Sequence, residues 1–376
     1  MRLVDPARQE QARRYARIKR RLYFVELGLG VGFLLLLLTC NLSSGIRDLL
    51  PLPLPLQVGL YAAIIGGLYG CITFPFTMYE SFLLPKRYGL SLQTLQAWLK
   101  DLGKATLLMT VLGLLVIEVL YWLLGRFPHT WWVWAALFIV LMSVVLAHLA
   151  PVLIVPLFFK FRPLEDTTLA QRLTDLAKRT KTPVGGVFTL DMSTKGTVSN
   201  AALMGLGSTR RIMLTDTLLG RYTADEIEVI LAHELAHHVH RDLPKGMLVE
   251  SATTALALWV TDLTLNAGIG WFGFHGLDDI ATFPLLALVL GSVALVTGPI
   301  RQAYSRRVER AADVYALEMT DKPRAFISMM SKLADQNLAE WQPSPWVEFF
   351  FFDHPPIGKR VALAQSFTAT REKEHG

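Results

Sequence analysis

Residues 231–240 read LAHELAHHVH, a stretch that holds four histidines and one glutamate in ten positions. Within it, His233, Glu234 and His237 form the pattern HExxH. On a helix, side chains four positions apart project from one side, so His233 and His237 can both coordinate one tetrahedral Zn²⁺ ion. Glu234 is the next residue round the helix and can take a proton from a zinc-bound water. The alternative interpretation is a helix that carries histidines without any chemistry.

The residues before this motif predict where its helix begins. The sequence TADE at 223–226 has the spacing of a capping box, which satisfies free backbone groups at a helix start. Ile227 and Leu231 then supply an apolar face that can be buried. A helix with this cap favours the metal site over the alternative. His238 and His240 lie off the ligand face and are predicted to take no part.

Composition indicates a multi-pass membrane protein. Of the 376 residues, 52% are hydrophobic and only 18% are charged, and the mean hydropathy is +0.38, so much of the chain is too apolar for a water-exposed surface. The net charge of +6 does not indicate nucleic-acid binding, because the basic residues cluster at the ends of apolar runs. Cys40 and Cys71 lack the spacing of a thiolate metal site or a disulfide framework.

Several apolar runs reach the roughly 20 residues that cross a bilayer. Basic connections alternate with connections poor in Lys and Arg, which places both termini and the segment 160–246 in the cytoplasm. The compact chain, rich in Leu and Arg, is typical of a bacterial protein, so the expected location is the bacterial inner membrane. The six predicted spans are 23–42, 58–78, 105–125, 131–159, 247–269 and 283–300.

Two stretches outside the spans read as soluble. Residues 160–246 alternate helix and strand signals and contain the HExxH motif, while 301–376 are mostly helical. The predicted division is therefore a four-span region at 1–159, a catalytic segment at 160–246, two spans at 247–300 and a helical segment at 301–376. A site that uses both soluble stretches must assemble beside the membrane.

A catalytic zinc takes three protein ligands and leaves one position open. The stretch SRRVERAAD at 305–313 supplies the best source of the third. Glu309 and Asp313 are four positions apart on a predicted helix, so Glu309 can ligate the metal while Asp313 accepts a hydrogen bond from a ligand imidazole. In the alternative, the neighbouring arginines merely pair with these acids on a solvated helix. Spacing alone leaves both interpretations open.

These motifs resemble those of the type-I CAAX prenyl protease family of integral-membrane zinc peptidases. HELAHH is followed, after two apolar spans, by SRRVERAAD, and four other stretches resemble the family in the same order. The resemblance extends from about residue 79 to 362 and implies a mainly α fold, in which a polytopic helical membrane protein carries a small α+β zincin-like catalytic domain at the cytoplasmic face. The four stretches are YESFLLPKRYGLSLQTLQAWLKD, APVLIVPLFFKFRPLED, GGVFTLDMSTKGTVSNAALMGLGSTRRIMLTDTLL and DHPPIGKR.

The resemblance also implies roles for individual residues. It makes His233, His237 and Glu309 the ligands of a single Zn²⁺ ion and Glu234 the general base. Asp313 becomes the hydrogen-bonding partner of a ligand.

Four further matches lie outside the metal ligands. Asn200 and Ala201 match the edge strand that binds substrate, although a β-turn Asn is the alternative for Asn200. His354 is implied to stabilise the oxyanion, and Arg360 to brace the site by pairing with an acid such as Asp313.

The predicted function is a membrane-embedded zinc endopeptidase that hydrolyses membrane-associated substrates by Glu-assisted attack of a zinc-bound water. Two substrate classes stay open, which are CAAX-like peptides and misfolded membrane proteins in quality control. A non-catalytic zinc-binding scaffold or transporter is the alternative of another class, and the intact Glu234 disfavours it. The expected partners are a peptide or membrane-protein substrate and the lipid bilayer, with no nucleic acid, and the sequence does not determine the oligomeric state.

Overall fold

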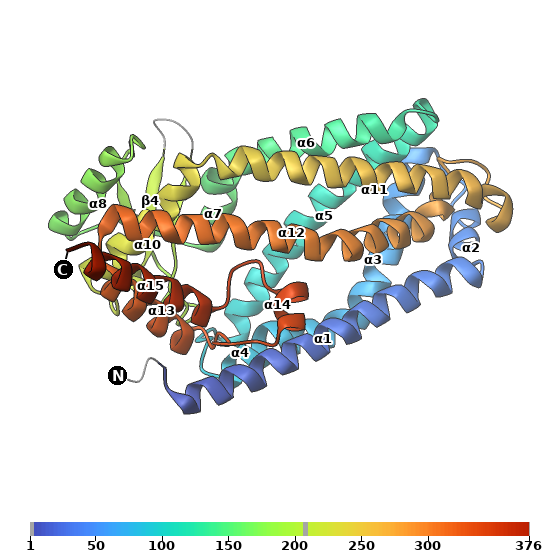
Figure 1. Cartoon of the computed structure of the whole chain (residues 1–376). Coiled ribbons are helices and arrows are strands. Elements are labelled where there is room, and N and C mark those ends of the chain that lie inside the picture. Colours follow the sequence, from blue (N-terminus) through green and yellow to red (C-terminus); the bar gives the residue numbers. More distant parts are fainter. Residues whose placement is uncertain (1–3, 206–209, 376) are drawn as a thin grey trace.

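Long helices run side by side through most of the protein, and a small sheet lies at one end of them (Figure 1). The computed structural model describes residues 4–205 and 210–375. Within this part of the chain, five helical segments are long and apolar enough to cross a membrane. These segments are Pro6–Thr39, Leu54–Arg87, Leu95–Arg126, Trp131–Phe158 and Ile280–Thr320.

The first half of the chain forms the greater part of the bundle. Two π-helical turns, η1 and η2, continue α3 and α6 into the short helices α4 and α7, and η2 begins beside Pro151. The elements are α1 (Pro6–Thr39), α2 (Leu42–Asp48), α3 (Leu54–Met78), η1 (Tyr79–Leu83), α4 (Leu84–Arg87), α5 (Leu95–Arg126), α6 (Trp131–Leu149), η2 (Ala150–Ile154) and α7 (Val155–Phe158).

The sequence predicts about six membrane spans, one more than the five apolar segments of the structure. Five predicted spans overlap those segments, although 23–42 and 131–159 end beyond Thr39 and Phe158. The sixth, 247–269, lies in α11 (Asp242–Phe272), which is long enough but less apolar. Asp262 in this helix accepts a hydrogen bond from Trp131 Nε1 at 2.7 Å. Polar groups therefore lower the hydropathy of α11, which lies alongside α6 and α12 (Figure 1).

The sheet belongs to the segment that precedes α11. Its strand order is β1-β2-β4-β3, with β2 parallel to β4 and the two outer pairs antiparallel. Strand β3 therefore forms one edge. The elements of this segment are β1 (Phe161–Pro163), α8 (Thr167–Arg179), β2 (Val187–Leu190), β3 (Ala201–Met204), β4 (Arg211–Thr215), α9 (Asp216–Leu219) and α10 (Ala224–Val239).

The C-terminal part joins the bundle to the sheet end. Helix α12 (Phe283–Thr320) follows the short turn η4 (Ile280–Thr282), begins as an apolar span and continues past the bundle to contact α10. Three helices complete the chain, namely α13 (Pro323–Gln336), α14 (Pro345–Phe351) and α15 (Ile357–His375).

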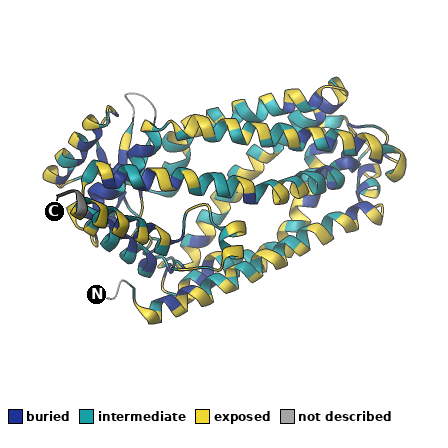
Figure 2. Cartoon of the chain, in the orientation of Figure 1, coloured by how far each residue is buried: buried dark blue, intermediate teal, exposed yellow. Residues whose placement is uncertain are grey.

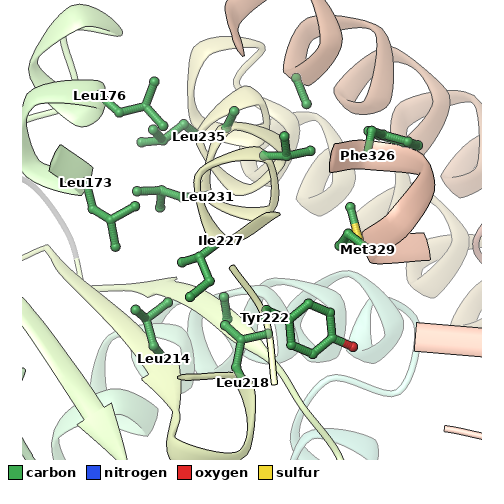
Figure 3. Packing of buried hydrophobic residues seen from close by; sticks show 14 of the residues in the cluster. Leu173, Leu176, Leu214, Leu218, Tyr222, Ile227, Leu231, Leu235, Phe326 and Met329 are labelled. Atoms are coloured by element: carbon green, nitrogen blue, oxygen red, sulfur yellow. The ribbon is translucent and has the colours of Figure 1, made fainter. Parts of the chain in front are cut away.

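Helix α10 is the centre of the largest apolar core. Leu231 and Leu235 of α10 lie between Leu176 of α8 and Phe326 of α13, and Leu214 of the sheet lies below them (Figure 3). Burying such a side chain fully is worth roughly 1.5–3 kcal/mol. This packing fixes the rotation of α10 and therefore the direction in which its histidines project.

The long helices of the bundle leave many apolar groups uncovered. Buried residues gather near the sheet and at the opposite end of the bundle, whereas much of the outer surface of the long helices is exposed (Figure 2). Leu107 and Val152 are 67% and 69% exposed, respectively, which is unfavourable in water and favourable in lipid. The exposed apolar surface is that of a membrane protein.

Candidate metal centre

The helix that carries HExxH begins where the sequence predicts. Thr223 caps α10, because Glu226 N donates to Thr223 Oγ1 at 3.3 Å and Thr223 N donates to Glu226 Oε2 at 2.8 Å. The reciprocal capping box is thus confirmed. The helix ends at Val239, and Arg241, with φ of 55°, makes the left-handed turn that starts α11.

His233, His237 and Glu309 converge between α10 and α12. One ligand atom from each lies within 4.8 Å of the others, close enough to hold one metal ion. Glu309 Oε2 is 3.1 Å from His233 Nε2, and Glu309 Oε1 is 3.5 Å from His237 Nε2. The two imidazole rings are perpendicular, with centroids 5.0 Å apart.

The chemistry of these donors fits a divalent cation. Glu309 Oε2 is buried and has no hydrogen-bond partner of standard geometry in the part of the chain that the structure describes. Such an atom costs about 1–3 kcal/mol, which coordination of a cation would offset. Burial by itself would lower the pKa of His233, but contacts with Asp313 and Glu309 raise this pKa to about 9. The cluster therefore concentrates the negative potential that attracts a cation.

A carboxylate lies behind each imidazole. Asp313 Oδ1 is 3.0 Å from His233 Nδ1, and Arg360 binds Asp313 with Nε at 2.8 Å and Nη2 at 2.5 Å. His237 Nδ1 is 3.0 Å from Asp242 Oδ2. Partners of this kind fix the ring orientation of metal-binding histidines. Sequence reasoning missed Asp242, since only the left-handed turn at Arg241 reveals that the start of α11 returns to the site.

Glu234 borders a pocket of about 160 Å³ beside the cluster. Burial raises the pKa of its carboxyl group, although both neighbouring imidazoles act in the opposite direction. The pocket extends from Glu234 to the start of β3, where Asn200 and Ala201 line it. His354 and Arg360 line it as well.

His354 reaches the cluster from the loop between α14 and α15. Its Nε2 is 3.3 Å from Glu309 Oε2, and its Nδ1 is 2.9 Å from Asp353 Oδ1. The Asp353 hydrogen bond raises the pKa of His354. Arg306 anchors this loop by donating to the backbone oxygen of Phe352 at 2.5 Å. Neither Asp353 nor Arg306 was predicted to serve the site. Arg306 acts through a contact with a distant segment, whereas Asp353 contacts the adjacent His354.

The start of β3 leaves main-chain groups available. Thr215 N donates to Asn200 O at 3.0 Å, which pairs these two residues across the β3–β4 ladder. Because hydrogen-bonded pairs alternate along an antiparallel ladder, the N–H and C=O groups of Ala201 and Leu203 point to the free edge. The Asn200 side chain is exposed.

The remaining histidines of the motif lie outside the cluster. His240 stacks edge-on against Tyr315, with centroids 5.4 Å apart. Burial lowers the pKa of His238, with Arg210 and His237 acting in the same direction. Neither belongs to the His–His–Glu cluster.

Two imidazoles and a glutamate that converge on one point, with a second glutamate at the neighbouring pocket and helices that adjoin membrane-length segments, define a membrane-embedded metallopeptidase. Sequence comparison identifies the group more closely. The chain belongs to peptidase family M48, which residues 163–368 match, and residues 2–160 match the CAAX prenyl protease N-terminal region with five membrane helices. It is thus a membrane zinc metalloprotease.

Relatives cover most of the chain. It is 28% identical over 369 residues to the uncharacterized metalloprotease YhfN of Bacillus subtilis (strain 168), covering 96% of this chain and 86% of that protein. It is 27% identical to CAAX prenyl protease 1 of Saccharomyces cerevisiae, covering 83% and 73%. The crystal structure of S. mikatae Ste24p has the same fold, with a TM-score of 0.87, 22% identity and coverage of 96% and 90%.

Proposed function

We propose that the protein is a membrane-embedded endopeptidase in which His233, His237 and Glu309 hold a single Zn²⁺ ion and Glu234 is the general base. The observation that carries this proposal is the convergence of the three ligand atoms within 4.8 Å beside Glu234. Zn²⁺ bound at such a site polarises a carbonyl group and lowers the pKa of a water to near neutrality.

Glu234 performs the proton transfers in this proposal. Its carboxylate takes a proton from the attacking water and returns it to the leaving amine nitrogen. The raised pKa of the buried carboxyl group makes Glu234 a stronger base toward the attacking water. His354 lies beside Glu309. In this proposal it donates a hydrogen bond to the substrate oxygen on which negative charge develops.

Arg360 and Asp313 hold the His233 ring in the orientation that metal binding needs. The paired Arg360 holds the Asp313 carboxylate against His233 Nδ1, which leaves His233 Nε2 free to face the metal. Asp242 does the same for His237.

Substrate binding is assigned to the edge of β3. An extended peptide can add to the outward groups of Ala201 and Leu203 by main-chain hydrogen bonds. This position would lead its scissile bond past Asn200 into the pocket that Glu234 and His354 line.

We place the active site at the cytoplasmic side of a bacterial inner membrane. The support is the clustering of Lys and Arg in the first twenty-one residues and in the connections near the sheet end. The substrates are accordingly peptides or proteins already associated with that membrane, and the preferred class is CAAX-like.

Purified protein in detergent tests this function. Cleavage of a fluorogenic peptide should stop when a chelator removes the metal and should return with added Zn²⁺. Chelator-insensitive cleavage would refute the metal mechanism, and a zinc-loaded protein that cleaves nothing would support a scaffold or transporter. Comparing a farnesylated CAAX peptide with a misfolded membrane protein separates the two substrate classes. The CAAX peptide should be cleaved efficiently, and efficient cleavage of the misfolded protein alone would favour quality control.

A further inference from the structure

The segment that leads into β3 is held by the membrane half of the protein. Leu92 N donates to Lys195 O at 2.9 Å, and Thr197 N donates to Leu90 O at 3.2 Å. Ser91 and Gly196 form an antiparallel bridge between these bonds. Because residues 90–92 lie in the connection between α4 and α5, a loop of the bundle pairs with the approach to β3.

Lys195 reinforces this contact with its side chain. Its Nζ lies 2.5 Å from Asp101 Oδ2 of α5, and Gln93 Nε2 donates to the same oxygen at 2.8 Å. The Nζ atom also lies 4.5 Å from the centroid of the Phe159 ring, which follows α7. The side chains of Lys195 and Asp101 are only 22% and 24% exposed, so this pair is screened less than a surface pair.

Gly196 permits the close approach of the two backbones. A Cβ atom at this position would lie 2.6 Å from Leu90 O, nearer than real Cβ contacts allow. Because the obstructing atom belongs to the backbone, a side-chain rotation cannot relieve the clash. Any larger residue must move either the 90–92 loop or the approach to β3.

The catalytic half holds the other end of the same segment. Gln336 of α13 is buried, and its Nε2 donates to Ser199 Oγ at 2.6 Å and to Thr197 O. Its Oε1 accepts a hydrogen bond from Tyr222 at 2.9 Å. Ser199 lines the pocket beside Asn200, so the path from the membrane loop to the pocket is fixed at both ends.

We propose that residues 90–93 and Asp101 form a clamp that sets the position of the β3 edge, which makes Lys195 and Gly196 positioning residues for peptide binding. The inference rests on the proposed function of that edge. A strand that is ordered before the substrate arrives loses less entropy on binding, so the clamp raises affinity. It touches none of the residues in the metal cluster and acts on binding rather than on the chemical step.

Two variants loosen the clamp in different ways. Gly196→Ala introduces the backbone clash, and Asp101→Asn removes the charge that faces Lys195. Gly103→Ala is the matched glycine control, because nothing lies within 4 Å of its added Cβ. Asp175→Asn is the matched charge control, since Asp175 is exposed and lies on α8.

For each variant, kcat, KM and zinc content are measured with the fluorogenic peptide. In the clamp variants KM should rise about fivefold or more, the effect of weakening one or two hydrogen bonds. Their kcat and zinc content should stay near wild type, and the controls should match wild type in all three. Unchanged KM in both folded clamp variants would overturn the proposal, as would a loss of zinc together with kcat.

Two further measurements separate this inference from the proposed function. Binding of the same peptide to Glu234→Gln, with and without Gly196→Ala, reports affinity when cleavage is abolished. Cleavage by Glu234→Gln itself would count against the proposed mechanism and leave the clamp standing. If wild-type protein neither binds nor cleaves the peptide, backbone amide hydrogen exchange tests the clamp instead. Faster exchange at 197–204 in Asp101→Asn than in Asp175→Asn would support the clamp, and equal exchange would exclude it.

Discussion

Two buried Arg–Asp pairs differ in what else they touch, and the helices that carry their arginines, α15 and α2, lie at opposite ends of the molecule (Figure 1). Arg360–Asp313 lies at the metal centre, and Arg47–Asp279 joins α2 to the loop before η4. In each pair the arginine side chain is 10% exposed and the aspartate 1%.

The difference lies in the third partner. Asp313 Oδ1 is 3.0 Å from the ring of His233, a metal-cluster residue. Asp279 instead accepts from the backbone N–H groups of His275 and Ala281, each at 2.9 Å. Burial and pairing alone therefore do not distinguish the two pairs, whereas the contact of Asp313 with His233, a proposed zinc ligand, does.

The largest effect is expected for Asp313→Asn. This change leaves the Arg360 charge unpaired, which costs about 3–5 kcal/mol of folding free energy for a buried pair. It also frees the His233 ring, which should weaken zinc binding by about 10–100-fold. Thermal unfolding and competition with a chromogenic zinc chelator measure the two losses. Wild-type zinc affinity in this variant would remove the distinction between the pairs.

Asp279→Asn should reproduce only the first of these losses. Unfolding free energy should fall, but by less than in Asp313→Asn, because Arg47 loses its buried partner and keeps the exposed Asp48, whose Oδ1 is 2.9 Å from Arg47 Nε. Zinc content and kcat, measured well below the melting temperature, should match wild type. Zinc loss from the folded variant would show that the far end of the bundle also controls the metal centre.

A smaller effect is expected for Asp242→Asn, which tests the other imidazole. Asp242 is near His237 but has no arginine partner among the described residues, and Lys245 is 3.9 Å away. Zinc affinity should fall about tenfold, the low end for such partners. The melting temperature should change little. A drop in stability as large as that of Asp313→Asn would contradict this ranking.

The smallest effect concerns Glu228, on α10 but outside the metal cluster. Burial alone would raise its pKa, but hydrogen bonds from Lys322 and Arg172 lower it. Because the folded pKa lies below the unfolded value of about 4.3, this contribution is complete above that pH and is lost as pH falls through the folded pKa. The effect is about 1 kcal/mol or less, since Arg172 is 35% exposed. The difference in melting temperature between wild type and Glu228→Gln should therefore shrink below pH 4, and a constant difference would contradict this.

Features encoded in consecutive residues were predictable. The capping box at Thr223 and the apolar face of α10 need only a short stretch of sequence, and the structure has both. The strand signals predicted within 160–246 correspond to strands such as β2 and β4. The membrane-protein class follows from composition, because apolar runs of this length match the thickness of the hydrocarbon core of a bilayer.

Features that depend on distant contacts were not predictable from the residues alone. The spacing of Glu309 and Asp313 allowed a solvated helix as readily as a ligand helix, and only the resemblance favoured the second. Asp242 requires the left-handed turn at Arg241. The predicted span 247–269 is not among the five segments that length and apolarity select, because hydrophobic residues in α11 are interspersed with polar groups such as Asp262.

The account's central claim is that one Zn²⁺ ion held by His233, His237 and Glu309 serves a reaction whose proton transfers depend on Glu234. Zinc stoichiometry and peptide turnover of Glu234→Gln, measured on the same sample beside Glu309→Ala, test it most directly. Glu234→Gln should keep one zinc per chain and lose about 100-fold or more of its turnover, while Glu309→Ala should fail to retain stoichiometric zinc. Normal turnover by zinc-loaded Glu234→Gln, or full zinc retention by Glu309→Ala, would contradict the account.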